Sequence, residues 1–312
     1  MSFNSETFID QWLDDRDYVI AHTSGSTGRP KAIRLFKNDM IVSARATNEF
    51  FGLHRGSKIV LPLSEDYIAG KMMIVRALLS HAHIISEPPS RSPLSERLPY
   101  SVDLVAIVPQ QIRGLISSPC AIRNVIVGGG PIPSDDEKLA LSARPDIRWW
   151  ATYGMTETCS HVALRAFGED WFSALPGISF SLDGGKCLVI TNQAASWSPV
   201  VTNDIVDLRD ARSFRWLGRV DNVIISGGLK IHPEIVEKAF EKVMGSRNFY
   251  IVGRPSEAWG TECVLKIEGE RDFDLETAIQ EVIRGLIPHH RPKSIEFVPS
   301  FQYTSSGKII RK

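Results

Sequence analysis

The chain has 312 residues, in which 36 lysines and arginines balance 36 aspartates and glutamates. This length exceeds the roughly 100 to 200 residues of one compact domain, so we expect two domains. A balanced charge leaves no basic surface of the kind that binds nucleic acid or an anionic membrane.

Targeting and redox features are also missing from the sequence. The N-terminus lacks the basic start and apolar centre of a signal peptide, and no apolar run approaches the ~20 residues of a transmembrane helix. Four well-separated cysteines form no Cys-x-x-Cys pair, which argues against a structural zinc site or a disulfide framework. We therefore expect a cytoplasmic protein with reduced cysteines.

Strands and helices alternate through the first half of the chain. Strands are expected at 18–21, 58–63, 82–86, 102–108, 124–127 and 147–151, and helices at 38–51, 68–80 and 134–143. Asn38 is the expected N-cap of the first helix. Short apolar strands of this kind are typical of a buried parallel sheet, which predicts a doubly wound α/β domain with its ligand at the carboxyl ends of the strands.

The pattern changes after about residue 167. Short strands at 178–182, 186–191 and 200–208 indicate a β-rich subdomain that closes the first unit. The tail reads as a strand (222–225), a Gly-Gly turn, a helix (233–244), two strands (249–252 and 262–267), a helix (275–286) and a strand (295–298). We therefore expect an N-terminal domain of residues 1–218 and a small α+β C-terminal domain of residues 219–312.

Three loops that follow strands carry residues suited to an anion. In the first, at 23–31, glycines expose backbone amides while hydroxyls and cations add donors. It is not a Walker A loop, because Pro30 precedes Lys31 and Ala32 follows it, and by itself it also fits a flexible Gly/Ser turn. The other two, at 128–133 and 152–158, also follow strands, so all three can converge on one site.

Six motifs in order resemble the core motifs of the adenylate-forming superfamily, which contains acyl-CoA synthetases, nonribosomal adenylation domains and luciferases. They are Thr-Ser-Gly-Ser-Thr-Gly-x-Pro-Lys at 23–31, Gly-Gly-Gly-Pro at 128–131, Tyr-Gly-Met-Thr-Glu at 153–157, Thr-Asn-Asp at 202–204, Gly-Arg-x-Asp at 218–221 and Ser-Ser-Gly-Lys-Ile at 305–309. The resemblance implies the adenylate-forming enzyme fold with a mobile C-terminal lid. Family members usually carry a longer portion before the phosphate loop, so we expect an N-terminally shortened form.

The resemblance implies two half-reactions: a carboxylate attacks the α-phosphate of ATP to give an acyl adenylate and pyrophosphate, and the thiol of CoA then displaces AMP. The residues implied to bind ATP are Thr23, Ser24, Gly25, Ser26, Thr27, Gly28, Lys31, Gly128, Gly129, Gly130, Tyr153, Gly154, Asp204 and Arg219. Loop 23–31 would hold the β- and γ-phosphates, and Asp204 the ribose hydroxyls. Catalysis is assigned to Lys308, which would neutralise charge at the α-phosphate, to Thr156, and to Glu157 as the Mg²⁺ ligand.

A hinge rotation of the small domain would serve the second half-reaction. Asp221 matches the hinge position, while Gly227 and Gly228 would let the pantetheine arm of CoA pass, with Lys230 nearby. The acyl pocket is assigned to Tyr67 and His161.

Each assignment also has a simpler interpretation. Lys31 could serve as an ion-pair partner that shapes its loop. Asp204 could be a turn residue, and Lys308 could be a solvated surface charge. The pair His289-His290 is expected at the surface, and Trp149-Trp150 in the core and its wall.

Within the superfamily, the Ser-Gly-Gly at 226–228 and the compact size are most similar to short o-succinylbenzoate-CoA ligases of menaquinone biosynthesis. The second carboxylate of that substrate needs a polar or cationic contact, for which Arg76 and His161 are candidates. Alternatives are another aryl- or acyl-CoA synthetase, a stand-alone adenylation enzyme that loads a carrier protein, and a non-catalytic nucleotide-binding protein. Expected partners are a small carboxylic acid, ATP, Mg²⁺ and CoA, and an apolar surface left by the shortened domain favours a homodimer.

Overall fold

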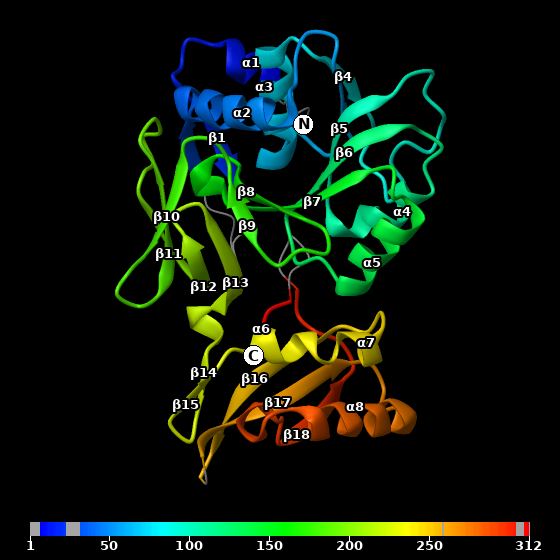
Figure 1. Ribbon diagram of the computed structural model, residues 1–312, viewed down its shortest axis with the longest axis vertical. Helices are drawn as coiled ribbons and strands as arrows, with labels where there is room; N and C mark the ends of the chain where they lie inside the picture. Colours follow the sequence, from blue (N-terminus) through cyan, green and yellow to red (C-terminus); the bar gives the residue numbers. More distant parts are fainter. Residues whose placement is uncertain (1–6, 23–31, 258, 304–308, 312) are drawn as a thin grey trace, which may run out of the picture.

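The computed structural model describes residues 7–22, 32–257, 259–303 and 309–311, which form a larger and a smaller lobe (Figure 1). The buried apolar side chains gather in three clusters. Two lie within residues 8–214 and the third within residues 224–279, so each lobe has its own core.

The larger lobe is organised by one 11-stranded sheet in the order β10-β11-β12-β13-β9-β8-β7-β6-β5-β3-β4. Its strands are β3 (Lys58–Leu61), β4 (His83–Ser86), β5 (Val102–Ile107), β6 (Ile122–Val127), β7 (Arg148–Gly154), β8 (His161–Ala166), β9 (Phe172–Ala174), β10 (Ile178–Leu182), β11 (Cys187–Asn192), β12 (Val200–Asp210) and β13 (Ser213–Arg219). Pairing is parallel from β7 to β4 and antiparallel from β7 to β10. The β-rich region therefore extends the parallel sheet and is not a sheet of its own.

Helices cover both faces of the parallel strands. The helices of this lobe are α1 (Phe8–Leu13), α2 (Lys37–Phe51), α3 (Ile68–Ser80), α4 (Ile112–Ile116) and α5 (Ser134–Ala143), with short 3₁₀ turns η1 (Pro109–Gln111) and η2 (Thr156–Thr158). Ile59 and Leu61 belong to the cluster under α2 and α3, whereas Val60 belongs to the cluster under α4 and α5. This alternation follows from the two-residue period of a strand and confirms the predicted doubly wound core.

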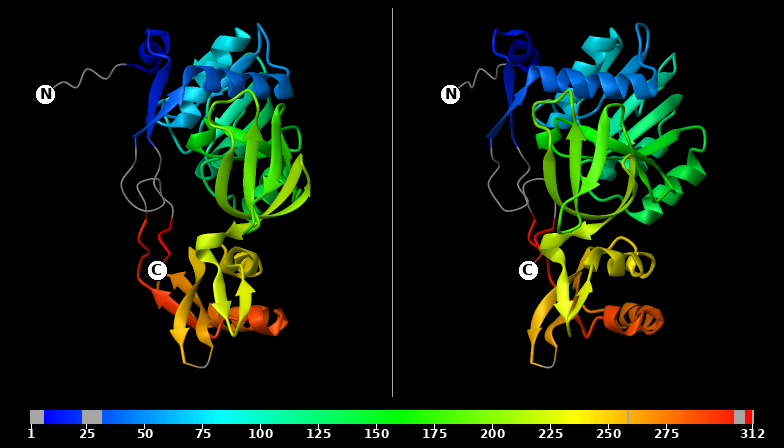
Figure 2. Two further views of the ribbon diagram at one scale, coloured as in Figure 1. Left: turned by 90° about the vertical axis from the view of Figure 1, so that its left-hand side faces the viewer. Right: turned by 60° about the vertical axis from the view of Figure 1, so that its left-hand side comes forward.

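An antiparallel hairpin of β1 (Tyr18–His22) and β2 (Ala32–Phe36) flanks the large sheet as a separate two-stranded sheet. Figure 2 shows it running along one side of the larger lobe toward the C-terminal residues of the smaller lobe. The sequence did not predict β2, and the expected N-cap at Asn38 is wrong for the same reason. β2 leads directly into α2, whose N-cap position is Phe36 with no side-chain hydrogen bond.

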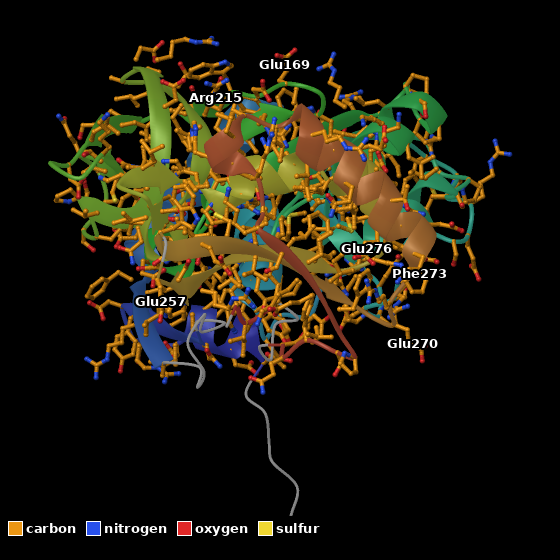
Figure 3. The ribbon with its side chains drawn as sticks, turned by 90° about the horizontal axis from the view of Figure 1, so that it is seen from below. Glu169, Arg215, Glu257, Glu270, Phe273 and Glu276 are labelled. Atoms are coloured by element: carbon orange, nitrogen blue, oxygen red, sulfur yellow. The ribbon has the colours of Figure 1, made fainter. Side chains whose placement is uncertain are left out.

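The smaller lobe is an α+β unit, as expected. Its elements are η3 (Val220–Asn222), β14 (Ile224–Ser226), β15 (Leu229–Ile231), α6 (Pro233–Lys238), α7 (Glu241–Met244), β16 (Phe249–Ser256), β17 (Gly260–Glu268), α8 (Phe273–Gly285), η4 (Pro288–His290) and β18 (Ser294–Val298). Strands β16, β17 and β18 form one sheet, and β14 pairs with β15 in another. Viewed from below in Figure 3, α8 crosses this lobe with Phe273 and Glu276 toward its outer end.

The single helix predicted over 233–244 is wrong, because the structure divides it into α6 and α7. Between them the amides of Ala239 and Phe240 bond the carbonyls three residues back, those of Val236 and Glu237. This tighter turn places Phe240 fully inside the core of the smaller lobe.

Some bulk features of the structure bear on the expected class of protein. In the part of the chain that the structure describes, no helix has both the length and the apolar character to cross a membrane. All four cysteines are unpaired and buried. Among the described residues, no three His, Cys, Asp or Glu side chains are grouped so as to hold a metal ion. Trp149 is buried, and His289 is exposed.

Candidate active site

The loops after β6 and β7 lie against each other at the carboxyl edge of the parallel strands. A side chain at Gly128 would approach the hydroxyl of Thr152 to 2.3 Å, and that hydroxyl donates a hydrogen bond to the carbonyl of Val127 at 3.2 Å. Gly129 has a φ of +87°, which other residues rarely adopt. The predicted loops at 128–133 and 152–158 therefore meet at Gly128 and Thr152, and this contact leaves no room for a side chain at Gly128.

The turn after β7 presents the predicted Thr156 and Glu157. At Gly154 a side chain would come within 2.4 Å of the backbone of Ser160 and His161, so only glycine allows this close return of the chain. Thr158 closes the turn, because its hydroxyl accepts from the amide of Met155 at 3.2 Å and donates to the carbonyl of Ser160 at 2.8 Å. The Glu157 side chain is left exposed on this rigid turn.

Asp204 on β12 is the centre of a buried polar cluster. Its carboxylate accepts from the Tyr153 hydroxyl at 2.6 Å and from the Trp216 indole nitrogen at 3.1 Å. Burial first, and the Asp204 charge second, raise the pKa of Tyr153 well above its usual value, so this hydroxyl stays protonated and donates. Tyr153 also packs edge-on against Phe214, at 4.9 Å between ring centroids. Asp204 is thus oriented by two aromatic donors, one of which, Tyr153, is packed against Phe214.

Arg219 connects this cluster to the predicted hinge. Antiparallel pairing of β12 with β13 places Asp204 opposite Arg219. The guanidinium lies 3.9 Å from the Asp204 carboxylate and 3.0 Å from that of Asp221, which also accepts from the amide of Asn203 at 3.2 Å. Asp204 of one motif and Arg219 and Asp221 of another are therefore neighbours in the fold.

A buried cation lies behind the turn after β7. Arg76 of α3 is 2% exposed, and its guanidinium contacts the Ser160 hydroxyl and, at 3.4 Å, the Met73 sulfur. Its Nε has no hydrogen-bond partner among the described residues. Burial lowers the pKa of Arg76 to about 9, so the group is charged at neutral pH. A buried charge without a carboxylate partner is costly to the fold.

His161, the other candidate for the second carboxylate, lies beside this cation, and both contact the Ser160 hydroxyl. Its ring nitrogens are 3.2 Å from the Thr47 hydroxyl and 3.4 Å from that of Ser160. Burial first, and the charge of Arg76 second, lower the pKa of His161 well below its usual value, so the ring is neutral at pH 7. It also lines a cavity of about 10 Å³ together with Asp39 and Thr158.

Tyr67, the other predicted acyl-pocket residue, is in a different setting. It occupies the N-cap position of α3 and is 60% exposed, and it does not line the cavity at His161. Of these candidates, the structure brings His161 and Arg76 together, and the assignment of Tyr67 to the acyl pocket stays a prediction.

The predicted CoA residues form the turn of the β14–β15 hairpin. Gly227 and Gly228 both have positive φ, and a Cβ added to Gly227 would lie 3.1 Å from the Trp259 ring, a tight contact. Lys230 on β15 is exposed. The predicted phosphate-loop residues Thr23, Ser24, Gly25, Ser26, Thr27, Gly28 and Lys31, and the predicted catalytic Lys308, lie outside the described residues.

Two residues of the site were not predicted from the sequence. Trp216 orients the Asp204 carboxylate, and Asn203 holds Asp221. The signal for Trp216 was the alternation of Phe214, Trp216 and Gly218 in a strand opposite residues 204–208, but β13 was not predicted as a strand.

Comparison with known proteins places this arrangement in a family. A family model described as AMP-binding enzyme matches residues 5–194. The chain belongs to the AMP-binding enzyme family. The predicted superfamily is therefore confirmed.

Relatives in this family include two bacterial ligases. The 2-succinylbenzoate–CoA ligase of Enterococcus faecalis is 28% identical over 94% of this chain and 68% of its own length. The ligase of the same name from Listeria monocytogenes serotype 4b is 24% identical over 99% of this chain and 72% of its own length.

Solved structures of the family share the fold. An acyl-CoA synthetase (AMP-forming)/AMP-acid ligase II-like protein from Dyadobacter fermentans is 30% identical, covers 97% of this chain and 90% of its own, and has a TM-score of 0.63. The o-succinylbenzoate CoA synthetase of Bacillus subtilis, solved with its acyl-adenylate intermediate, is 18% identical, covers 94% of this chain and 67% of its own, and has a TM-score of 0.79. The predicted adenylate-forming fold is confirmed.

Proposed function

We propose that the chain is an ATP-dependent acid–CoA ligase that activates 2-succinylbenzoate, as in menaquinone biosynthesis. The observation that carries the choice of substrate is the buried Arg76, which is charged and has no carboxylate partner among the described residues. An acid with a second carboxylate would supply that partner through a charge-assisted hydrogen bond. Ser160 and the neutral His161 next to Arg76 would complete the polar end of the acyl pocket.

In the first half-reaction, a carboxylate oxygen of the acid attacks the α-phosphorus of ATP. The bond from that phosphorus to the bridging oxygen breaks, and pyrophosphate leaves with the electron pair. Loop 23–31 would hold the β- and γ-phosphates, the 128–130 backbone would lie against adenine, and Thr156 and Lys308 would stabilise charge at the α-phosphate. Asp204, already held by Tyr153 and Trp216, would accept the ribose hydroxyls with its remaining lone pairs.

Magnesium fits the turn after β7 through Glu157. The side chain is an exposed carboxylate on a turn fixed by Thr158, with no cluster of further ligands among the described residues. One carboxylate together with phosphate oxygens and waters is how Mg²⁺ is commonly held, whereas an all-protein cage is unusual. The ion would neutralise charge on the phosphate oxygens of ATP.

In the second half-reaction, the thiol of CoA attacks the acyl carbon and AMP leaves. Residues 219–312 would rotate about Asp221 as a mobile lid, bringing the hairpin with Gly227, Gly228 and Lys230 to the site. In the present orientation the side-chain amide of Asn203, on β12 of the larger lobe, donates to Asp221, a contact that the rotation would break. A cytoplasmic location is part of the proposal, and a homodimer remains a prediction.

Exchange of labelled pyrophosphate into ATP across a panel of acids tests this function. We expect 2-succinylbenzoate to stimulate exchange, and benzoate and fatty acids to do so weakly or not at all. Exchange stimulated by another acid and not by 2-succinylbenzoate would support the ligase activity but contradict the proposed substrate. Acyl transfer to a carrier protein in place of free CoA would identify a carrier-loading enzyme, and nucleotide binding without exchange would identify a non-catalytic protein.

Asp204→Ala is expected to raise the Michaelis constant for ATP about 10- to 150-fold, since hydrogen bonds to a charged group would be lost. The constant for the acid should change little. Asp207→Asn on the same strand is the matched control, because Asp207 pairs with Arg215 at the surface. Steady-state kinetics with each substrate varied would measure the effect, and equal changes in both variants would contradict the ribose assignment.

The Michaelis constant for the acid, at saturating MgATP, is expected to be flat from about pH 6.5 to 8. The lowered pKa of His161 keeps its ring neutral throughout this window, and Arg76, with a pKa of about 9, remains protonated. A pH series of initial rates would measure this. An inflection near pH 6.5 that disappears in His161→Gln would contradict the environment assigned to His161.

A further inference from the structure

Arg311 binds the C-terminal residues 309–311 to helix α6 of the smaller lobe. Both terminal nitrogens of Arg311 donate to the carboxylate of Glu237 on α6, at 2.6 and 2.8 Å. Such a two-bonded pair fixes direction as well as distance. The two side chains are only 26% and 13% exposed, so the pair is partly shielded from water.

Glu237 is itself fixed within the lobe. Its carboxylate accepts from the backbone amide of Ile251 on β16 at 2.7 Å, which ties α6 to the sheet. Arg311 also lies over the ring of Tyr250, at 5.8 Å from its centroid. The arginine is therefore held from two elements, α6 and β16, and the end of the chain cannot shift without breaking these contacts.

The other side of this C-terminal segment is held as well. Tyr303 pairs with Ile309 in an antiparallel bridge, and the amide of Ile310 donates to the carbonyl of Gln302 at 2.8 Å. The Tyr303 hydroxyl donates to Glu268 at 2.6 Å and accepts from Asn248 at 2.9 Å. Residues 303 and 309–311 are thus anchored to β16, β17 and α6.

The same helix contacts the hinge. Glu234 of α6 lies 4.0 Å from Arg311, and its other contact is with Asn222, whose amide donates to it at 2.5 Å. A side chain at Gly218 would come within 2.5 Å of this carboxylate, so the hinge strand passes directly over it. Helix α6 therefore contacts both the C-terminal segment, through Glu237, and the hinge, through Glu234.

We propose that Arg311 is a positioning residue for the adenylation half-reaction. By binding Glu237 it fixes residues 309–311 to α6, and this anchor would constrain Lys308, three residues earlier in the sequence. The inference rests on the proposed function of Lys308. A misplaced catalytic group costs rate even when the residue itself is unchanged, so the pair matters for the step that uses Lys308 and not for the step that does not.

The test compares the two half-reactions in Arg311→Gln, Arg311→Lys, Glu237→Gln and the double variant Arg311→Gln/Glu237→Gln. We expect each Gln variant to lose adenylation rate at least about tenfold, with Arg311→Lys intermediate, because charge-assisted bonds are removed. The Michaelis constant for ATP and the release of AMP by CoA from a supplied synthetic acyl adenylate should stay within about twofold. The double variant should be no worse than either single one, since both remove the same interaction.

Glu276→Gln is the matched control. Glu276 pairs with Arg271 at 2.9 Å near the outer end of α8 in the same lobe (Figure 3), so its loss removes an ion pair without touching the C-terminal segment. If the wild type is active, three results in the variants would overturn this inference and leave the proposed function intact. These are an equal loss of rate in both half-reactions, additive losses in the double variant, and no loss of adenylation rate. A wild type that forms no adenylate from any acid would overturn the proposed function and the inference with it.

Discussion

Lys308→Ala is expected to reduce acid-dependent pyrophosphate exchange by about 10²–10³-fold or more, the range seen when one charge-stabilising donor is removed from an active site. Adenylation concentrates negative charge on the α-phosphate and the bridging oxygen, and the proposed role of Lys308 is to neutralise it. Much of the CoA step should survive when a synthetic acyl adenylate is supplied, because a rotated lid would use different residues there.

Lys238→Ala separates this effect from a general change in charge. Lys238 is an exposed residue of α6 in the same lobe, so its removal should leave both half-reactions unchanged. Rapid-quench measurement of adenylate formation and a separate assay of thioester formation give the two rates. If Lys308→Ala slowed both steps equally, the two-orientation scheme would be wrong.

Arg76→Met is expected to raise the Michaelis constant for 2-succinylbenzoate by about 100-fold, since the loss of one partner of a buried charge pair costs about 2–5 kcal/mol. The constant for ATP should be unaffected. In the free protein the same change removes a buried charge that has no carboxylate partner among the described residues. We therefore expect the melting temperature to stay the same or to rise, because a hydrophobic side chain of similar size often replaces a buried charge without loss.

Two controls make this result specific to the second carboxylate. An acid that lacks that group should bind no worse to Arg76→Met than to the wild type. Arg76→Lys should give an intermediate constant, because a lysine keeps the charge but not the fork of donors. A large fall in melting temperature with equal losses for both acids would instead indicate a structural role for Arg76.

The elements predicted well were those decided by local pattern. Helices α3 and α5 and strand β10 have the predicted bounds, because their apolar spacing and flanking turns are complete within the element itself. Strands β8 and β13 were missed, although each pairs antiparallel with the strand directly before it in the chain. For β13 the alternation of apolar residues was a local signal that was not used, whereas β9 has only 3 residues, too few to show a period.

The sequence motifs identified Asp204, Arg219 and Asp221 as site residues. Only the pairing of β12 with β13 in the fold brings Asp204 next to Arg219 and Asp221. The sequence could name Arg76 only as one of two candidates, with His161, for contact with the second carboxylate. The burial of Arg76 could not be predicted, because the burial of a charged residue in an apolar helix is decided by its packing partners. Tyr67 was assigned to the acyl pocket from the family resemblance, and the fold leaves it exposed.

The central claim is that one chain converts an acid to its adenylate and then to its CoA thioester. Mass spectrometry of purified protein with 2-succinylbenzoate, ATP, Mg²⁺ and CoA tests it directly. We expect one AMP for each 2-succinylbenzoyl-CoA formed, with the acyl adenylate accumulating when CoA is withheld. ADP as the product, or AMP released without any acyl adenylate or thioester, would contradict it.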